Sequence, residues 1–281
     1  MNIGKELQTN LMTMQSIFTD CGDIVFREFA AADGRGRLFL VYADNMVNTS
    51  AVEDAILTNI MNRCDFAEAE GNLGDLMESV IANRDVRRVY TMEEAADGVM
   101  VGDTVIFMEG SPYALQASTR GFPNRGVGHV ETEMVVQGPK DAFTELLAFN
   151  LVLIRRRIRD TRLKVVRKQV GSRGKTDIAL LYLEDLVRPE VLESVKTQLD
   201  RLQLETICDS GYLEQLLEKR QFSPFPQLQM TERPDKAAAA LLEGRVVIAV
   251  DNTPFVVLLP ATWNLFFQAA EDYYVRWEMM S

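Results

Sequence analysis

The side chains that usually perform catalysis are sparse in this chain. Its one histidine, His129, excludes sites built from several histidines. No serine lies in a G-x-S-x-G pattern, and no two cysteines have C-x-x-C spacing. Carboxylates are abundant, but none form a pair set apart by spacing, and Glu131 and Glu133 are interpreted as the solvated face of a strand. The sequence therefore predicts no catalytic residue, no metal site and no cofactor.

The G-S-R-G-K-T run at 171–176 superficially resembles a phosphate-binding loop. Gln169 occupies the position where the first glycine of that motif belongs. The run also joins two expected strands, whereas a phosphate loop leads from a strand into a helix. We therefore expect a hairpin turn that binds no nucleotide.

Positive charge is concentrated in one short segment. Between Arg155 and Lys175 the chain has ten basic residues and the single acid Asp160, although its net charge is −11. The overall acidity argues against general nucleic-acid binding, because phosphate contacts need a basic face. Two interpretations of the segment stay open: a solvated surface paired with acids elsewhere in the fold, or an interface with a partner chain or anionic lipid headgroups.

The composition is that of a folded intracellular chain. Hydrophobic residues make up 47% and charged residues 25%, which is enough apolar material for a core. The three cysteines are far apart and odd in number, which suits a reducing compartment. The N-terminus lacks the apolar region of a signal peptide, and no continuous apolar run reaches the roughly 18 residues of a spanning helix. We expect the chain, as given, to be soluble.

Long-range self-similarity indicates how the elements are organised. An offset of 140 places residues 5–56 on 145–196 without a gap, and an offset of 142 places 105–115 on 247–257. Two distant matches in the same order and at nearly one offset predict a tandem duplication of domain size. The matched pairs include Leu7 with Leu147, Asn10 with Asn150, Val25 with Val165, Tyr42 with Tyr182 and Pro112 with Pro254.

The duplication predicts an α/β fold of two tandem duplicated lobes that face each other over a cleft. The first lobe covers 1–139 and includes a Gly-rich connection at 117–139, and the second covers 140–281. Each should contain a helix, a hairpin, a second helix and further α/β elements that close with another hairpin. In the second lobe, spacing and turn residues predict a helix over 140–159, strands at 163–170 and 177–183, a helix from Pro189 and a hairpin at 245–259.

One long segment carries a family resemblance. Residues 120–158, R-G-F-P-N-R-G-V-G-H-V-E-T-E-M-V-V-Q-G-P-K-D-A-F-T-E-L-L-A-F-N-L-V-L-I-R-R-R-I, resemble the signature of the spore germinant-receptor A-subunit family, the GerA family. The stretches T-E-R-P-D-K-A-A at 231–238, D-N-T-P-F-V at 251–256 and E-D-Y-Y-V-R-W at 271–277 are also similar to it. Gln137 departs from the arginine that members usually have, which leaves open which relative this is, the stage V sporulation paralogue included.

The resemblance implies a large N-terminal domain on the cytoplasmic side of the spore inner membrane. It also implies a membrane-spanning domain downstream, two other receptor subunits (B and C) as partners, and homo-oligomers formed through the full-length protein. A juxtamembrane C-terminal helix would then place Tyr273, Tyr274 and Trp277 at the headgroup level; the open alternative is a final helix that packs these rings on the second lobe.

The resemblance and the basic segment together suggest residues for an interface or for signalling. Successive helical residues point about 100° apart, so the arginine triplet at 155–157 cannot meet one partner. At least one arginine should pair with an acid inside the fold, Glu133 or Glu145, and another should be left for a neighbouring subunit or the membrane. The candidates are Arg125, Glu133, Glu145, Asn150, Arg155, Arg156 and Arg157.

The expected function is nutrient-triggered signalling or ion-channel gating without catalysis. The alternative is a two-lobed small-molecule-binding module that closes on a ligand in its cleft. An enzyme with a carboxylate pair in the cleft is a more remote alternative.

Overall fold

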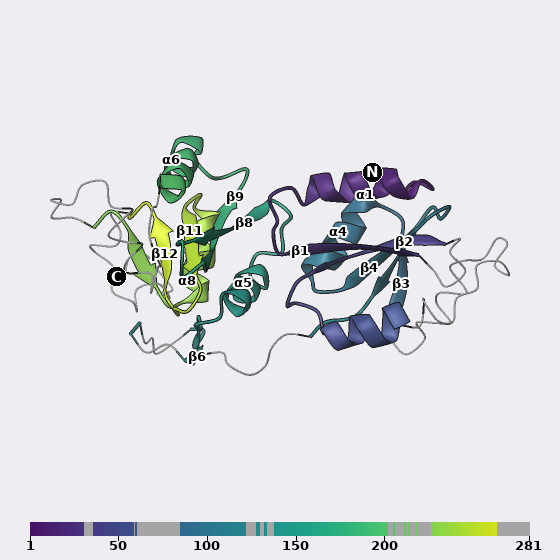
Figure 1. Cartoon of the computed structure of the whole chain (residues 1–281), viewed down its shortest axis with the longest axis horizontal. Helices are drawn as coiled ribbons and strands as arrows, with labels where there is room; N and C mark the ends of the chain where they lie inside the picture. The colour runs from purple at the N-terminus through teal and green to yellow at the C-terminus, as the bar shows by residue number, and fades with distance from the viewer. Residues whose placement is uncertain are drawn as a thin grey trace, which may run out of the picture. The chain divides into compact units, whose positions relative to one another are not determined.

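The protein, seen here in a computed structural model, divides into two compact α/β units (Figure 1). The first unit comprises Met1–Pro123 with Arg159–Thr161, and the second comprises Asn124–Ile158 with Arg162–Ser281. The division after Pro123 falls inside the Gly-rich connection, earlier than the expected boundary after residue 139. The structure describes residues 1–30, 36–58, 60, 85–121, 128–129, 132–133, 138–201, 205, 211, 213, 217 and 226–262.

The first unit is one antiparallel five-stranded sheet with helices on both faces. Its strand order is β1-β2-β4-β5-β3. Helices α1 and α4 pack on one face, where Phe39 and Phe107 stack with ring centroids 4.5 Å apart. The π-helix η1 covers the other face (Figure 1). The described elements are α1 (Leu7–Ile17), β1 (Ile24–Ala30), β2 (Arg37–Ala43), η1 (Ala51–Leu57), β3 (Val86–Val89), α4 (Met92–Met100), β4 (Thr104–Met108) and β5 (Ala114–Ala117).

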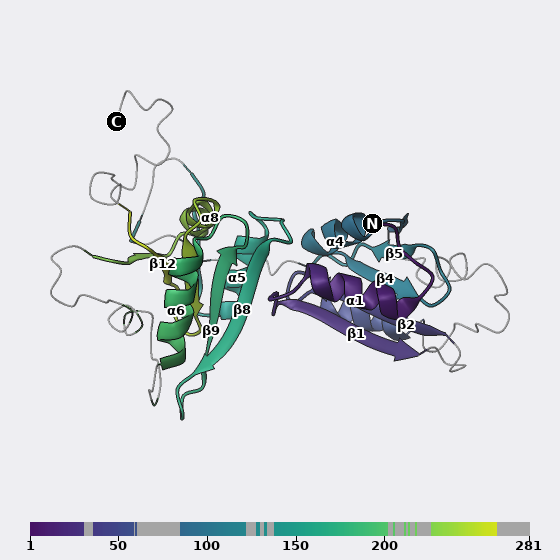
Figure 2. The same ribbon diagram turned by 90° about the horizontal axis from the view of Figure 1, so that it is seen from above.

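The second unit has the same layers. Its sheet has the order β8-β9-β11-β12-β10, again with every neighbouring pair antiparallel. Figure 2 shows α6 on one face of this sheet, and α5 and α8 pack on the other. The described elements are β6 (Gly128–His129), β7 (Asp141–Ala142), α5 (Leu147–Arg155), β8 (Leu163–Val170), β9 (Thr176–Leu183), α6 (Pro189–Arg201), β10 (Gln229–Thr231), α8 (Pro234–Leu242), β11 (Val246–Val250) and β12 (Val256–Leu259).

Apolar residues on both faces explain why β9 and β11 lie inside the sheet. In β9 the residues Ala179 and Leu181 face α5 and α8, whereas Leu180 and Tyr182 face α6. A strand buried on both faces needs an apolar run rather than alternation, and I-A-L-L-Y-L supplies one. Full burial of each large aliphatic side chain contributes about 1.5–3 kcal/mol.

The strand registers confirm the duplication. Leu38 pairs with Met108 in the first unit, and Ile178 pairs with Val250 at the equivalent position in the second. The pairs between β4 and β5, and between β5 and β3, likewise recur between their counterparts in the second sheet. Two sheets with one strand order and matching registers would not arise from apolar patterning alone. The cleft between the lobes stays a prediction.

One predicted match is wrong by a residue. Val25 pairs with Tyr42 in the first unit, but the residue that pairs with Tyr182 in the second is Lys164, not Val165. The first strand of each unit is therefore related by an offset of 139. Because side chains alternate between faces, this shift places Phe26, which contacts Phe18 of α1, in register with the inward-facing Val165.

The helix expected over 140–159 begins only at Leu147. The preceding residues form β7 and an extended segment whose backbone is held by other parts of the unit. Phe143 N donates to the carbonyl of Glu232 at 2.8 Å, and Thr144 N donates to Asn150 Oδ1 at 2.8 Å. The apolar spacing extends upstream of Leu147, but these hydrogen bonds hold Phe143 and Thr144 outside the helix, so α5 begins later than the spacing predicts.

Candidate functional site

Asn150, one of the predicted signalling residues, is a buried staple within the second unit. Its Oδ1 accepts from Thr144 N, and its Nδ2 donates to the Thr144 carbonyl at 2.6 Å. Asn10 makes the same pair of bonds with Gly4 in the first unit, at 3.0 and 2.7 Å. The matching asparagine therefore fixes the backbone before the first helix of each unit, a structural role that the repeat alone accounts for.

The arginine triplet divides as helical geometry predicts. Arg155 is 1% exposed, Arg156 lies at the exposed C-cap of α5, and Arg157 is half-buried. Arg157 Nη2 donates to both carboxylate oxygens of Asp141, at 2.7 and 2.8 Å, and its Nη1 donates to the Leu153 carbonyl. The acid that pairs with Arg157 inside the fold is thus Asp141, rather than Glu133 or Glu145.

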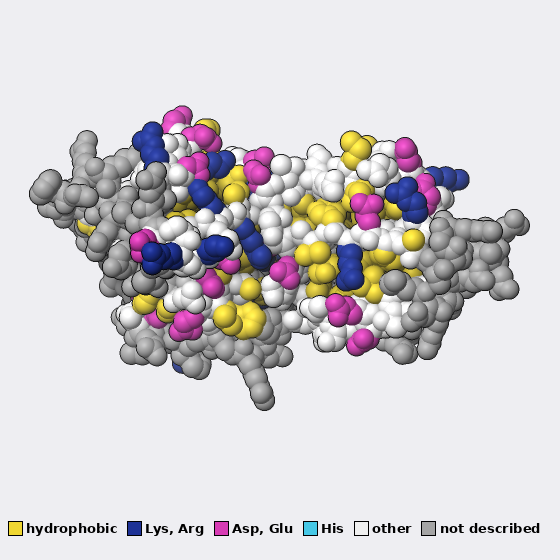
Figure 3. All heavy atoms as spheres, viewed as in Figure 1, with side chains coloured by type: hydrophobic (Ala, Val, Ile, Leu, Met, Phe, Trp, Pro, Cys, Tyr) yellow, Lys and Arg dark blue, Asp and Glu magenta, His cyan; other side chains and the backbone are white. Residues whose placement is uncertain are grey.

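Several further cations of the basic segment lie in ion pairs within the second unit. Arg162 pairs with Asp185 at 2.6 Å and Lys164 with Glu184 at 3.3 Å. Lys168 pairs with Asp200 of α6. Figure 3 shows basic and acidic side chains intermixed over the visible face of this unit. For these side chains the acid-paired surface is the arrangement observed.

The glycine run at 171–176 is the predicted hairpin turn between β8 and β9. Gly171 has a φ of 98°, and the N–H groups of Arg173 and Gly174 both donate to the carbonyl of Glu205 at 2.9 Å. Those N–H groups are the donors that a phosphate loop would direct at its ligand. They bind the chain itself here.

The other predicted site residues do not form one group. Glu145 is exposed, and its carbonyl accepts from Asn252 N at 2.7 Å. Arg125 and the expected C-terminal helix lie outside the described residues, as does Glu131. Glu133 is not on a solvated strand face as expected. Its side chain is 21% exposed and contacts Lys236. Glu133 is therefore the predicted site residue that belongs to a larger cluster of polar side chains.

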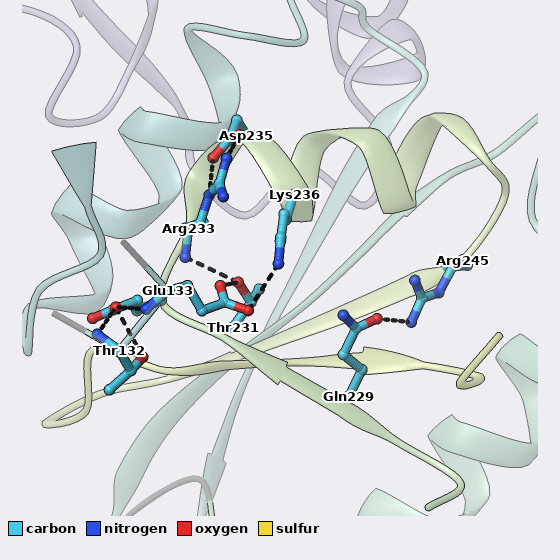
Figure 4. Close-up of polar contacts among 9 residues, drawn as sticks. Thr132, Glu133, Gln229, Thr231, Arg233, Asp235, Lys236 and Arg245 are labelled. Carbon is cyan, nitrogen blue, oxygen red and sulfur yellow. Dashed lines mark hydrogen bonds and ion pairs between the residues drawn. The ribbon is translucent and has the colours of Figure 1, made fainter. Parts of the chain in front are cut away.

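This polar cluster lies where β10 enters α8 (Figure 4). It consists of Thr132, Glu133, Thr231, Glu232, Arg233, Asp235 and Lys236. Thr231 Oγ1 donates to Glu133 Oε2 at 2.5 Å, and Lys236 Nζ donates to Glu133 Oε1 at 2.9 Å. Figure 4 shows the ammonium and the hydroxyl converging on one carboxylate.

The carboxylate of Glu232, at the start of α8, accepts hydrogen bonds from the connection. Its Oε1 accepts from Thr132 N at 2.6 Å, from Thr132 Oγ1 at 2.8 Å and from Glu133 N at 3.0 Å. Glu232 is only 4% exposed, and a buried carboxylate needs such donors to remain charged. Two residues of the connection are therefore bound to the start of α8.

Arg233 completes the cluster on its inner side. Its side chain is fully buried, and its Nε and Nη2 donate to the two carboxylate oxygens of Asp235 at 3.1 and 2.6 Å. Farther along the sheet, Arg245 Nη2 donates to Gln229 Oε1 at 3.2 Å (Figure 4). Bidentate pairing fixes the guanidinium plane, so Arg233 is held rigidly at the entrance to the helix.

The first unit has a smaller polar group at a different place. Asp103, 3% exposed, accepts from Arg120 Nε at 2.8 Å, from Arg120 Nη2 at 3.0 Å and from Gln116 Nε2 at 2.6 Å. The hydrogen-bonded carboxylate of Asp103 raises the pKa of Arg120. The position equivalent to Asp103 in the second unit is Arg245, so the two units diverged in their polar interiors.

The described residues contain no group of histidine, cysteine or acidic side chains that could hold a metal ion. Both sets of polar contacts join carboxylates to hydrogen-bond donors. What the arrangement can do is hold segments together by charge-assisted hydrogen bonds.

Sequence reasoning missed the cluster because its halves are about 100 residues apart. A local signal was present: T-E-R-P-D-K places four charged residues around a proline directly before an alanine-rich helix. Such a density of charge at a helix start, next to a buried strand, needs partners from elsewhere in the chain.

Fold and site together define the class of protein: a tandem duplicate of an antiparallel α/β unit whose connection is bonded to its second copy. The sequence pattern of the family described as Bacillus/Clostridium GerA spore germination protein matches residues 12–281. The chain belongs to the GerA family.

Curated relatives from Bacillus subtilis are similar over nearly the whole chain. The uncharacterized membrane protein YfkQ is 34% identical over 99% of this chain and 53% of its own length. Spore germination protein A1 is 34% identical over 96% of this chain and 55% of its own length, and stage V sporulation protein AF is 34% identical over 89% and 50%. The chain spans about half the length of the curated relatives it matches.

A solved structure shares the fold. The N-terminal domain of the A subunit of the Bacillus megaterium spore germinant receptor GerK3 has a TM-score of 0.73 and 28% identity. The match covers 94% of this chain and 98% of that domain. Among the described residues, no helix has the length and apolar character needed to cross a membrane.

Proposed function

We propose that this chain is the N-terminal domain of a spore germination receptor A subunit and takes part in nutrient-triggered signalling or channel gating. The observation that carries the proposal is the match to the GerK3 A-subunit domain, which covers almost all of both chains. The domain acts without catalysis or a cofactor. Its partners are the B and C receptor subunits and further copies of the full-length protein, at the cytoplasmic side of the spore inner membrane.

A genetic experiment tests the signalling role. In a spore former whose other GerA-family genes have been deleted, the full-length gene containing this chain should restore germination in nutrients, measured as loss of optical density. Its product should fractionate with the inner membrane and co-purify with the B and C subunits. Failure to restore germination, with the protein present in the spore, would overturn the proposal and favour a role like that of the stage V relative, which is equally similar in sequence.

A binding experiment separates signalling from ligand capture. Thermal shift measurements with amino acids, sugars and nucleotides should be silent for the isolated domain, and no nucleotide should be hydrolysed. A ligand present at about 100 times its dissociation constant would add roughly 2.7 kcal/mol of stability, a readily measured effect. A specific shift would support the small-molecule-binding alternative instead.

A further inference from the structure

The equivalent helices α4 and α8 begin in different ways. Helix α4 has a self-contained capping box: Glu94 N donates to Thr91 Oγ1 at 3.2 Å, while Glu94 Oε2 accepts from Thr91 N at 3.3 Å and from Tyr90 N at 3.0 Å. The groups of this capping box lie within five consecutive residues, and Met92 N donates in addition to the Met1 carbonyl at 2.9 Å.

In α8 the two equivalent positions carry cations, with the acid Asp235 between them. At the offset of 142, Thr91 corresponds to Arg233 and Glu94 to Lys236, so two cations flank the first turn. The N-terminus of a helix is the positive end of its dipole, where cations are unfavourable and carboxylates are favourable. Arg233 also offers no acceptor for the N–H groups of that turn. The second unit has lost the local cap that the first retains.

A carboxylate from the connection pairs with one of these cations. Glu133 lies about 100 positions upstream, yet its carboxylate accepts from Lys236 and Thr231 at the start of α8. In exchange, the carboxylate of Glu232 accepts from the backbone of Thr132 and Glu133. The two segments thus exchange hydrogen bonds reciprocally, because each supplies a carboxylate and the other supplies its donors.

We propose that this reciprocal exchange is a releasable latch, which fixes the connection to the start of α8 in the second unit. The Glu133–Lys236 contact is partly exposed, with Lys236 at 14% and Glu133 at 21%, so water can replace it when the segment lifts, whereas Glu232 is 4% exposed. Lifting removes the compensating carboxylate from Lys236 and the backbone donors from Glu232 together. The latch therefore couples the position of the connection to the charge balance at the start of α8.

Hydrogen exchange on the intact 281-residue chain tests the latch directly. In Glu133→Gln and Lys236→Ala, exchange at the amides of Thr132 and Glu133 should accelerate at least about tenfold, together with exchange in the first turn of α8. Thr132→Val, which removes one hydroxyl donor, provides a milder variant that retains the fold. Glu94→Gln is the matched control, because it weakens the cap of α4 and should leave exchange at the connection unchanged.

The outcomes separate a latch from a plain structural cluster. The charge swap Glu133→Lys with Lys236→Glu should slow exchange at both segments relative to either single change, since it restores an ion pair. Exchange that rises in α8 but not at the connection would overturn the coupling. An even rise over the whole second unit, in the Thr132→Val variant as well, would show that the cluster is part of the global core and releases nothing.

Discussion

Asn150→Ala should lower the free energy of unfolding of the second unit by about 2–4 kcal/mol. Asn150 is fully buried and makes two short hydrogen bonds with the backbone of Thr144. Each lost bond contributes roughly 1 kcal/mol, and each buried backbone group left without this partner costs roughly 1 kcal/mol more. The two buried groups are the N–H and the C=O of one residue, so alanine affects both at once.

Hydrogen exchange in increasing urea measures the effect, because it reports the two units separately. Asn10→Ala is the matched variant, since Asn10 makes the equivalent bonds with Gly4, and it should destabilise the first unit instead. Asn150→Asp keeps the acceptor but turns an oxygen toward the Thr144 carbonyl, so it should be at least as harmful. A loss below about 0.5 kcal/mol for Asn150→Ala, or normal stability for Asn150→Asp, would show that the hydrogen bonds of Asn150 with Thr144 do not stabilise the unit.

Further variants probe the backbone, the arginines and a helix cap. Gly244→Ala should cost more than about 1 kcal/mol in urea denaturation, because Gly244 has a φ of 78° and a Cβ there would lie 2.4 Å from a backbone carbonyl oxygen; unchanged stability would contradict this. Arg157→Ala should lower the melting temperature in calorimetry because it removes the ion pair with Asp141, whereas Arg156→Ala, at an exposed position, should not. A larger drop in melting temperature for Arg156→Ala than for Arg157→Ala would contradict this assignment. Backbone hydrogen bonds lower the pKa of Glu94 from its ordinary 4.5, so its stabilising contribution is complete above that value and is lost as pH falls through the lowered folded pKa. The stability difference between the wild type and Glu94→Gln should accordingly shrink on acidification, and a constant difference would count against the cap.

Apolar patterning predicted the parts of the fold that depend on the core. The strands β8 and β9 and the helix α6 lie where periodicity placed them, and the repeat predicted two units of one topology. Patterning failed where backbone hydrogen bonds decide the structure. The start of α5 depends on the bonds of Thr144, and the shift at Val25 depends on one residue of length before the strand, which leaves the apolar alternation intact.

The candidate site was less predictable for the same physical reason. Glu133 could be chosen from its segment, but its partners Thr231 and Lys236 are distant in sequence and have no periodic relation to it. An ion pair between distant residues leaves no periodic pattern in the sequence, only a charged residue at each of the two positions. The sequence predicted that one arginine of the triplet pairs with an acid inside the fold. It did not predict Asp141 as that acid, because β7 was expected to be helical.

The contact between Glu133 and the start of α8 has a consequence for the order in which the protein is made. Glu133 leaves the ribosome about 100 residues before Lys236, so the carboxylate that pairs with Lys236 is already present when the helix emerges. A chain that starts at residue 140 would contain each helix and large-sheet strand that the structure describes in the second unit, yet it would lack that carboxylate. The smallest piece able to complete this unit therefore begins upstream of Thr132, within the segment that sequence alone assigned to the first lobe.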